Sequence, residues 1–539
     1  MIRIFWAFLL AASALFCNSS CKNGKTEPVI ITRDTTITPE TAITAMVLDS
    51  AGVEKYIQSS KLNESAAQRL RNFYVARNYQ YTWFDESGIT QQARGFWNLY
   101  NYYLTYNPDS TLLDKELQTE MSHFLDDSLY YKSTGKLPDT ELRLTRYFFE
   151  YAQYAYAGKI DPSELQWHIP RKKLDVVALL DSLLKTGGAD IQAWEPVNEN
   201  YLRMQEKLRQ YSDIRDAGGW DTLAVNKKIS PGDDAAFIRE VKNRLYREGL
   251  LTAEDSSTVY DSIMKKAVAK ARSRYGLNEK GGWDKSLVSE LNVSVEKRIR
   301  QILVNMERMR WLPKPASDIL IVANIPDFKL RVYEGKNVAL DMNIVVGKQG
   351  TNSVIFTNML KYIVFSPYWN VPYSISKNEI LPAMNRNRNY LARNNMEITG
   401  YNGKVPVVRQ KPGGNNSLGR VKFLFPNSYN IYFHDTPSKS LFEREQRAFS
   451  HGCIRLQKPF ELAQYLLRHQ PQWTEDSIRV AMDQDNETWV TLPSAVPVFI
   501  TYLTSYVDNN GDIHFTRDIY GHDKKLEEKL FHASVASKD

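Results

Sequence analysis

The spacing of apolar and polar positions changes once along the chain. From residue 43 to about 228, apolar side chains recur three and four positions apart, as Leu144, Tyr147 and Phe148 do. This is the spacing of a helix that buries one face against other helices. Aromatic residues at this spacing more often build a core than bind a ligand. We therefore predict a helical scaffold domain over residues 43–228, without a catalytic group of its own.

Three short helices are predicted next, over residues 229–293. Ile238, Val241 and Leu245 share one face of the first helix, which Asp233 or Asp234 can cap. Two more runs with helical spacing follow it. A linking helix is then predicted within residues 294–316, because the helical pattern stops just before a proline.

After the linking helix the period changes from 3.6 to 2. Runs such as FKLRVYEG and NIYFHD alternate, are rich in β-branched and aromatic residues, and are separated by Gly, Asn and Pro. Near the end, Asn510 and Gly511 are predicted to supply the positive φ angles of a tight hairpin turn. The predicted fold class is thus multi-domain α+β, with a β-rich C-terminal domain. That domain covers residues 317–520, with a polar capping insertion at 374–418, and a polar tail follows at 521–539.

The first residues have a different character. Arg3 precedes a mostly apolar run of thirteen residues, 4–16, which is too short for a comfortable membrane span. We predict a secretory signal over residues 1–21 and a Thr-rich tether over 22–42, hence an exported protein of the periplasm or cell envelope. Two cleavage sites are open. Either Cys21 becomes the lipid-modified first residue of a lipoprotein, which would be the protein's only membrane attachment, or plain cleavage follows Ala14.

The net charge of the chain gives little information about its partners. The 539 residues include 69 basic and 62 acidic ones, which gives a formal net charge of +7. No block of Lys and Arg of the kind that neutralises a phosphate backbone is present, so we expect no nucleic-acid partner. A small basic excess fits a weak attraction to an anionic wall polymer, and it equally fits an ordinary solvated surface.

Cysteine usage singles out one thiol. Cys17 and Cys21 belong to the signal region, which leaves Cys453 alone in a chain expected to work where disulfides form. Four explanations are open: a nucleophile with its base, a zinc site, a redox thiol, or an inert buried residue. No CxxC or HxxxH pairing supports a metal, and no second thiol supports redox work. We therefore expect neither a metal nor a cofactor.

Two histidines accompany this thiol. His434 ends a strand-like run, and Ser450-His451-Gly452-Cys453 predicts a turn into another short strand. Two neighbouring strand ends would bring an imidazole within hydrogen-bond reach of the sulfur, where it lowers the thiol pKa and relays the proton. Gly452 permits a tight turn and the approach of a substrate carbonyl to main-chain N–H groups. The spacing leaves both His434 and His451 open as the base.

A stretch of fifteen residues separates His434 from Ser450-His451-Gly452-Cys453-Ile454-Arg455. This arrangement resembles the signature of the L,D-transpeptidases with a YkuD-type catalytic domain. The resemblance implies that Cys453 is the nucleophile and His434 the base, oriented by the main chain of Asp435. It implies that Ser450, His451 and Gly452 shape the turn and the oxyanion site. The positions expected to bind substrate are Tyr432, Arg455, Trp369 and Asn370.

The order of the predicted domains also resembles one branch of that family, the large multi-domain periplasmic enzymes. In that branch a helical scaffold, a peptidoglycan-binding-like unit and a linking helix precede a catalytic domain with a capping insertion. Residues 229–293 resemble the peptidoglycan-binding unit, although Arg274-Tyr275 replaces its usual aromatic–Gln pair. Ligand binding by this unit and a purely structural role therefore both stay open.

The resemblance implies a cysteine-dependent acyltransferase that acts on peptidoglycan stem peptides, as acyl donor and as acceptor. A Cys453 thioester would form with release of D-alanine and pass to another stem, giving a 3→3 cross-link. The capping insertion would act as a lid that excludes water. Covalent inhibition by carbapenems is expected as well. Two alternatives remain: an L,D-carboxypeptidase or other cysteine peptidase or amidase on the same stems, and a non-catalytic wall-binding scaffold.

Overall fold

The computed structural model describes residues 44–106, 112–127, 130–170, 174–185, 199–224, 228–315 and 317–532. The predicted signal and tether, with Cys17 and Cys21, lie outside these residues, so the predictions about them stay predictions. The chain forms two compact units, which are described separately: residues 1–93 with 115–146, and residues 94–114 with 147–539. None of the described helices is both long enough and apolar enough to cross a membrane.

The first unit is helical and is held together around a buried carboxylate. Glu141 accepts hydrogen bonds from the main-chain N–H groups of Thr82 (2.6 Å) and Trp83 (2.9 Å) and from the Tyr74 hydroxyl (2.9 Å). Burial raises the pKa of Glu141 to about 7. The elements of the first unit are α1 (Ser50–Ser59), α2 (Glu64–Ala76), β1 (Phe84–Asp85), β2 (Gly88–Ile89), α4 (Lys115–Asp126), α5 (Tyr130–Ser133) and the beginning of α6 (Leu137–Ala157).

The second unit contains the rest of the scaffold segment, and this part is not purely helical. Strand β3 (Trp167–His168) pairs in parallel with β7 (Ile355–Phe365), so it joins the C-terminal sheet. Trp167 is buried there, edge-on to Trp311 with 5.0 Å between ring centroids. The scaffold segment therefore completes the core of the C-terminal domain, which its helical pattern does not predict. Its other elements are α3 (Gln91–Tyr106), η2 (Pro162–Leu165), α7 (Val176–Lys185) and α8 (Glu199–Asp216).

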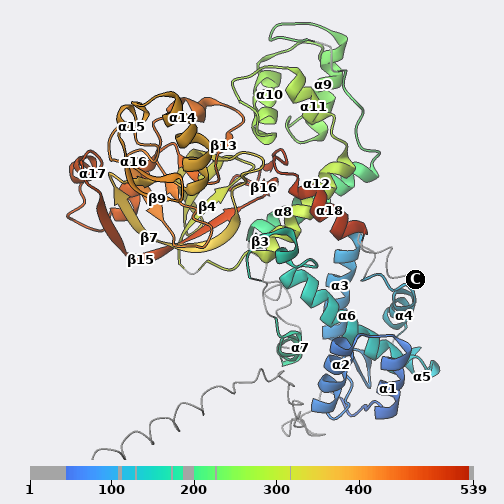
Figure 1. Cartoon of the computed structure of the whole chain (residues 1–539). Coiled ribbons are helices and arrows are strands. Elements are labelled where there is room, and N and C mark those ends of the chain that lie inside the picture. The colour runs from blue at the N-terminus through green and yellow to red at the C-terminus, as the bar shows by residue number, and fades with distance from the viewer. Residues whose placement is uncertain are drawn as a thin grey trace, which may run out of the picture. The chain divides into compact units, whose positions relative to one another are not determined.

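The three predicted short helices and the linking helix are present (Figure 1). Ala235, which makes no side-chain cap, precedes the first of them, so the predicted cap by Asp233 or Asp234 is wrong. Arg274 and Tyr275, in the three-helix segment, are buried there, and both hydrogen-bond to Glu248 of the same segment. The helices are α9 (Ala236–Arg247), α10 (Ser262–Arg274), α11 (Lys285–Leu291) and the linking helix α12 (Val295–Trp311).

The C-terminal domain is built on a sheet in the order β11-β12-β14-β6-β5-β4-β15-β7-β3, with β13 beside β6. Strand β11 also pairs with β7, which closes the sheet on itself. Helices α16 (Pro459–Leu467) and α17 (Glu475–Ala481) pack into the same main core as the inward strand residues. This confirms the predicted fold class. The strands are β4 (Ile319–Asn324), β5 (Lys329–Glu334), β6 (Asn337–Gly347), β11 (Val421–Leu424), β12 (Phe433–His434), β13 (Ala448–Ser450), β14 (Ile454–Leu456) and β15 (Thr488–Thr501).

The capping insertion has a fold of its own. Its strands form a three-stranded sheet in the order β8-β10-β9, over a small core of Val371, Ile380 and Val408. The polar composition hid these strands because most residues of β9 are exposed or half-buried. The elements of this region are β8 (Trp369–Asn370), α13 (Tyr373–Ile375), η4 (Ser376–Ile380), α14 (Leu381–Arg386), α15 (Tyr390–Arg393), β9 (Met396–Asn402) and β10 (Val405–Gln410).

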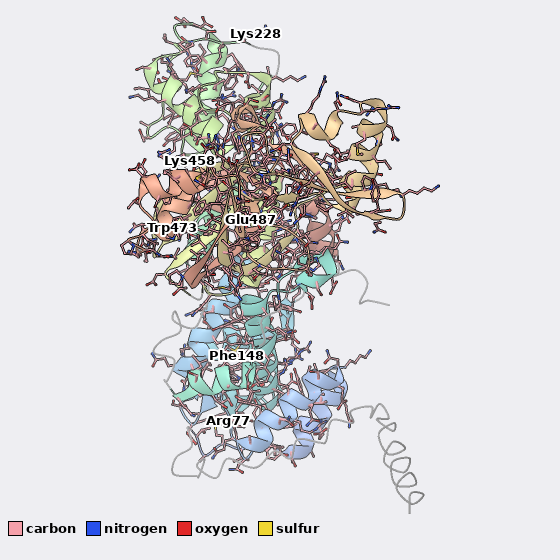
Figure 2. The ribbon with its side chains drawn as sticks, turned by 60° about the vertical axis from the view of Figure 1, so that its left-hand side comes forward. Arg77, Phe148, Lys228, Lys458, Trp473 and Glu487 are labelled. Atoms are coloured by element: carbon pink, nitrogen blue, oxygen red, sulfur yellow. The ribbon has the colours of Figure 1, made fainter. Side chains whose placement is uncertain are left out.

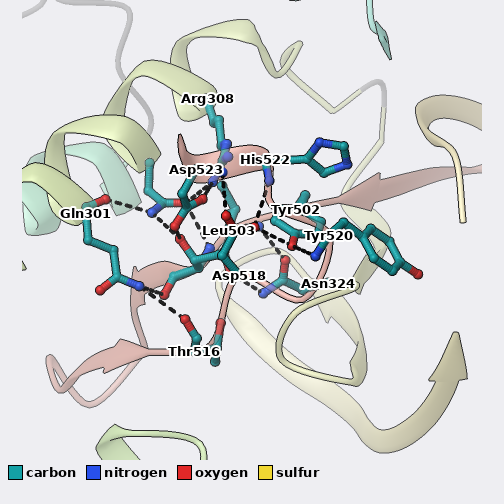
Figure 3. A network of polar contacts seen from close by, with 12 residues as sticks. Gln301, Arg308, Asn324, Tyr502, Leu503, Thr516, Asp518, Tyr520, His522 and Asp523 are labelled. Atoms are coloured by element: carbon teal, nitrogen blue, oxygen red, sulfur yellow. Dashed lines mark hydrogen bonds and ion pairs between the residues drawn. The ribbon is translucent and has the colours of Figure 1, made fainter. Parts of the chain in front are cut away.

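The end of the chain ties the linking helix to the sheet. The predicted hairpin is present as β16 (Ser505–Val507) and β17 (Ile513–Phe515), with a positive φ at Gly511 but not at Asn510. The segment predicted as a polar tail contains helix α18 (His522–His532). Arg308 of α12 pairs with Asp523 of α18 at 2.5 Å, at one end of the polar network in Figure 3.

Candidate active site

The register of two short strands decides which side chains share a surface. Strand β12 runs parallel to β14, with Phe433 opposite Ile454 and His434 opposite Arg455. Phe433 and Ile454 are fully buried in the main core. Because successive side chains of a strand point to opposite faces, His434 and Arg455 lie on the face that turns away from this core.

The same alternation adds Tyr432 and Cys453 to that face, two residues before His434 and Arg455. The rings of Tyr432 and His434 are 5.7 Å apart between centroids. We call these residues the catalytic quartet, after the role predicted for this site: Cys453, Tyr432, His434 and Arg455. Four of the predicted site residues are thus brought together by the pairing of strands that are far apart in the sequence.

Cys453 is half-buried at the end of its turn. Its Sγ donates to the main-chain carbonyl of Asn430 at 3.6 Å. Burial raises the pKa of the Cys453 thiol, and hydrogen bonds from Tyr432 and the charge of Arg455 only partly oppose this. The thiol pKa, which we expected a neighbouring imidazole to lower, is therefore raised, and the free enzyme holds a protonated sulfur at neutral pH.

His434 is almost fully buried, with 4% of its surface exposed. Its Nδ1 lies 2.5 Å from the main-chain carbonyl of Asp435, and a carbonyl can only accept, so Nδ1 carries the proton and Nε2 the lone pair. Burial, followed by the charge of Arg455, lowers the pKa of His434 to about 4. The imidazole is therefore neutral and ready to accept a proton at physiological pH.

Asp435 makes the main-chain contact that the sequence resemblance implied. Its carboxylate is also used, because it accepts from the main-chain N–H of Arg420 (2.9 Å) and from the Lys439 ammonium (2.5 Å). Gly419 makes room for it: a Cβ at this position would lie 2.4 Å from the Asp435 Cγ, and the φ of Gly419 is +62°. His434, the predicted base, is therefore held by a packed segment that reaches back to the end of the capping insertion.

His451 has different surroundings from His434. Its Nε2 lies 3.0 Å from the Glu379 carboxylate, and both side chains are substantially exposed. Glu379 belongs to η4 of the capping insertion. The structure therefore separates the two histidines that the spacing left open: His434 belongs to the quartet, whereas His451 contacts the cap.

The turn before the nucleophile is fixed by its own hydroxyl. Ser450 Oγ donates to the Cys453 carbonyl (2.6 Å) and accepts from the Gly452 N–H (3.1 Å). Gly452 has a φ of +119°, a conformation that residues with a Cβ rarely adopt. The turn geometry therefore depends on both Ser450 and Gly452.

Two residues that the sequence did not reveal support this turn from behind. Ser353 Oγ donates to the Gly452 carbonyl at 2.7 Å. The Tyr520 hydroxyl donates to the Gly347 carbonyl (2.5 Å) and accepts from the Ser353 N–H (3.3 Å). Tyr520 also lies beside Tyr502 in the network of Figure 3. Nothing near the motif could have pointed to them, since both lie far from it in the chain.

Trp369 and Asn370 lie elsewhere. Both belong to β8 and pair with β10 in the cap sheet, where Trp369 packs against the cap's own core. Neither belongs to the catalytic quartet, so their substrate-binding role stays a prediction. Within the part of the chain that the structure describes, no group of three or more His, Cys, Asp or Glu side chains is placed to hold a metal ion.

A family model for the L,D-transpeptidase catalytic domain, YkuD, matches residues 318–491, which include the whole quartet. This domain belongs to the L,D-transpeptidases. A second model, described as a scaffold domain, matches residues 68–208. The L,D-transpeptidase domain is thus preceded by a recognised scaffold, in the order that the sequence pattern predicts.

The chain is also similar to individual known proteins. A curated protein of Haemophilus influenzae described as "Putative L,D-transpeptidase" is 32% identical over 257 residues, which cover 45% of this chain and 52% of that protein. The match thus spans about half the length of this relative. An L,D-transpeptidase structure from Mycobacterium smegmatis is 16% identical, covering 34% of this chain and 59% of that one, with a TM-score of 0.20. One from Stackebrandtia nassauensis is 12% identical, covering 52% and 97%, with a TM-score of 0.22.

Proposed function

We propose that this protein cross-links peptidoglycan stem peptides through a thioester on Cys453. The observation that carries the proposal is the sheet face shared by the Cys453 thiol and a buried, neutral imidazole whose Nδ1 already binds a carbonyl. Acyl transfer by a thiol needs a nucleophile and a base of this kind. Membership of the L,D-transpeptidase family supplies the reaction class.

In the first half-reaction, Cys453 Sγ attacks the carbonyl carbon of the third stem residue while His434 Nε2 takes the thiol proton. The proton then passes from His434 to the amine of the terminal D-alanine as the C–N bond breaks. A thioester remains on Cys453, and D-alanine leaves. Because the free thiol is protonated, this transfer to His434 accompanies the attack rather than preceding it.

In the second half-reaction, the side-chain amine of another stem's third residue attacks the thioester. His434 takes a proton from that amine and returns it to the sulfur, which leaves as the thiol, and a 3→3 cross-link results. The Gly452 N–H already donates to Ser450 Oγ, so the oxyanion of each intermediate would be met by the N–H of Cys453. Arg455 is placed to attract a stem carboxylate.

The capping insertion would decide between cross-linking and hydrolysis. Its contact with the nucleophile turn, from Glu379 to His451, brings the cap next to the acyl-enzyme. A closed cap would exclude water and leave the amine as acceptor. Hydrolysis would instead turn the enzyme into a carboxypeptidase. Export, the lipid anchor at Cys21 and covalent inhibition by carbapenems remain proposals that rest on the sequence and on the family.

The test is mass spectrometry of the products formed from purified disaccharide-tetrapeptides, with Cys453→Ala protein as the control. We expect D-alanine and cross-linked dimers from the wild type, and neither product from the variant. A stable adduct of a carbapenem on Cys453 in the same spectra would support the thioester chemistry. D-alanine with trimmed monomers alone would indicate a carboxypeptidase, and no reaction under any condition would favour a wall-binding scaffold.

A further inference from the structure

A cavity of about 510 Å³ lies within the second unit, and no residue of the catalytic quartet lines it. Its volume falls in the range of pockets that hold small-molecule ligands. The three-helix segment (229–293) contributes residues 275–280 to its wall, and the C-terminal domain contributes residues 326–329 and the loop 442–447. The cavity therefore lies between the three-helix segment and the C-terminal domain.

The loop 442–447 is joined to the three-helix segment by Glu445. The Glu445 carboxylate accepts from the main-chain N–H of Asn278 at 3.2 Å, and its Oε1 lies 3.7 Å from Nη2 of Arg272. The last residue of the loop directly precedes β13. A ligand in the cavity thus contacts a loop that is held at one point by the three-helix segment and that continues into the strand before the nucleophile turn.

Arg447 ends this loop and lines the cavity. Its two terminal nitrogens donate to main-chain carbonyls, Nη1 to Arg444 at 2.7 Å and Nη2 to Phe328 at 3.3 Å. Its Nε is buried and meets no acceptor, and no carboxylate of the described residues forms an ion pair with it. The guanidinium therefore keeps an uncompensated charge, and guanidinium groups bind carboxylates strongly.

The nearest open carboxylate of the cavity belongs to Glu443. Burial lowers the pKa of Arg447, and the charges of Asp327 and Glu443 oppose this, so both carboxylates lie close to the guanidinium. Asp327 is already occupied by Arg331 at 2.6 Å and by the Tyr506 hydroxyl at 2.9 Å. The exposed Glu443 side chain has no ion pair or hydrogen bond among the described residues. Glu443 can therefore accept a cation from a ligand.

Two other cations of the wall already have partners. Lys329 and Arg331 pair with the Asp341 carboxylate at 2.7 and 2.9 Å. The main-chain carbonyl of Asp341 also accepts from Lys458 at 3.1 Å, a lysine that Figure 2 labels. Lys329 and Arg331 therefore stabilise the wall of the cavity, whereas Arg447 is left open to a ligand.

Strand β13 connects Arg447 to the nucleophile turn. The Arg447 carbonyl accepts from the Val346 N–H at 2.9 Å, and the Ser450 carbonyl accepts from the Lys348 N–H at 3.0 Å. Ser450 Oγ in turn donates to the Cys453 carbonyl. Because β13 has three residues, a displacement of Arg447 reaches this hydroxyl through a single short strand.

We propose that this cavity is an effector site for a zwitterionic peptide, which binds Arg447 through its carboxylate and Glu443 through its ammonium. A ligand with both charges fits better than a phosphate, because the carboxylates of the wall repel a dianion. Binding moves Arg447 and thereby changes the position of the turn that presents Cys453. The site goes beyond the proposed function, since it is separate from the quartet and assigns no step of the reaction.

Calorimetry on the full chain tests the ligand chemistry with alanyl-alanine, in its L,L and D,D forms, its C-terminal amide and its N-acetyl derivative. We expect one form of the dipeptide to bind, and both derivatives to bind about tenfold more weakly, which corresponds to about 1.4 kcal/mol. Arg447→Gln and Glu443→Gln should weaken binding of the dipeptide as much. No binding of either form, or equal binding of the derivatives, overturns the proposal.

A matched variant controls for the loss of a stacked arginine. Arg447 lies over the Phe328 ring, and Arg479 of α17 lies over the Phe460 ring at 4.1 Å, outside the cavity. Arg479→Gln should therefore keep the wild-type affinity for the dipeptide. Equal losses of affinity in Arg479→Gln and Arg447→Gln overturn the proposed place of the ligand.

Alkylation of Cys453 tests the effector role without any turnover. Iodoacetamide is reacted with the full chain, with and without saturating dipeptide, and mass spectrometry of the peptide that contains Cys453 gives the rate. We expect the dipeptide to change this rate about threefold or more in the wild type, and not in Arg447→Gln. This result supports the site even if the proposed reaction fails. An unchanged rate in dipeptide-saturated wild type overturns the effector role, whatever reaction the enzyme performs.

Discussion

Two buried ionisable groups, one in each unit, show what separates a structural site from a reactive one. Burial disfavours the charged form of both, raising the pKa of Glu141 to about 7 and lowering that of His434 to about 4. Glu141 accepts three hydrogen bonds from its own unit. His434 binds the main-chain carbonyl of Asp435 through Nδ1 and shares its sheet face with the Cys453 thiol. A perturbed pKa by itself therefore indicates burial, and only a thiol on the same face points to chemistry.

The largest effect is expected at the reactive group. His434→Ala should lower kcat/KM by roughly 10²–10⁴-fold, because the proton of Cys453 loses its acceptor. The matched control is His451→Ala, which should cost far less because that side chain contacts only the cap. Circular dichroism would establish that both variants are folded. Equal losses in the two variants would mean that His434 is not the sole base.

The pH dependence of the reaction follows from the same imidazole. His434 must be neutral to accept a proton, so kcat/KM should fall as the pH drops through about 4 and stay level from there towards neutral pH. A pH profile on a stable peptide substrate measures this. An acid limb near the ordinary pKa of histidine, 6.5, would show that the base is more solvated than its burial indicates.

The opposite dependence is expected for the stability of the first unit. A raised pKa in the folded state contributes stability that is full below the ordinary pKa of 4.5 and is lost as the pH rises through about 7. The shift amounts to about 3 kcal/mol. Urea unfolding between pH 4 and 8 should therefore show a falling free energy of unfolding. Glu141→Gln should flatten this slope; an equally steep slope in the variant would assign it to another group.

A smaller effect on stability and on kcat is expected at Gly419, which packs against Asp435. Gly419→Ala would push a methyl group against Asp435 and strain a positive φ, at a cost of about 1–3 kcal/mol. Thermal unfolding and kcat should both fall, since Asp435 orients His434. Gly414→Ala is the matched control, because an added Cβ there meets no atom within 4 Å. Similar melting temperatures and kcat values for the two variants would contradict the packing argument.

The smallest effect on stability and on kcat is expected at Tyr520, which supports the turn before Cys453 through Ser353. Tyr520→Phe removes the hydroxyl that binds Gly347 and Ser353, which should cost about 0.5–1.5 kcal/mol of stability. Because Ser353 in turn holds the Gly452 carbonyl, kcat should fall more than KM changes. Steady-state kinetics would check this. A variant with unchanged kcat and a lower melting temperature would make the contact purely structural.

Much of the fold could be predicted from local pattern. The helices of the scaffold, the three short helices and the linking helix follow the 3.6-residue period, and most strands follow the period of two. The strands of the cap were missed because their side chains are largely exposed and do not alternate clearly. Strand β3 was missed because two residues carry no period at all.

The candidate site also has a part that the local sequence predicts and a part that it does not. The sequence by itself predicted the turn that presents Cys453, because the contacts of Ser450 with Gly452 and Cys453 are local in the chain. Only the tertiary structure decided which histidine shares a sheet face with the sulfur and which residues support the turn. The physical reason is that strand register sets the face on which a side chain lies, and register is fixed by pairing between segments that are far apart in the sequence.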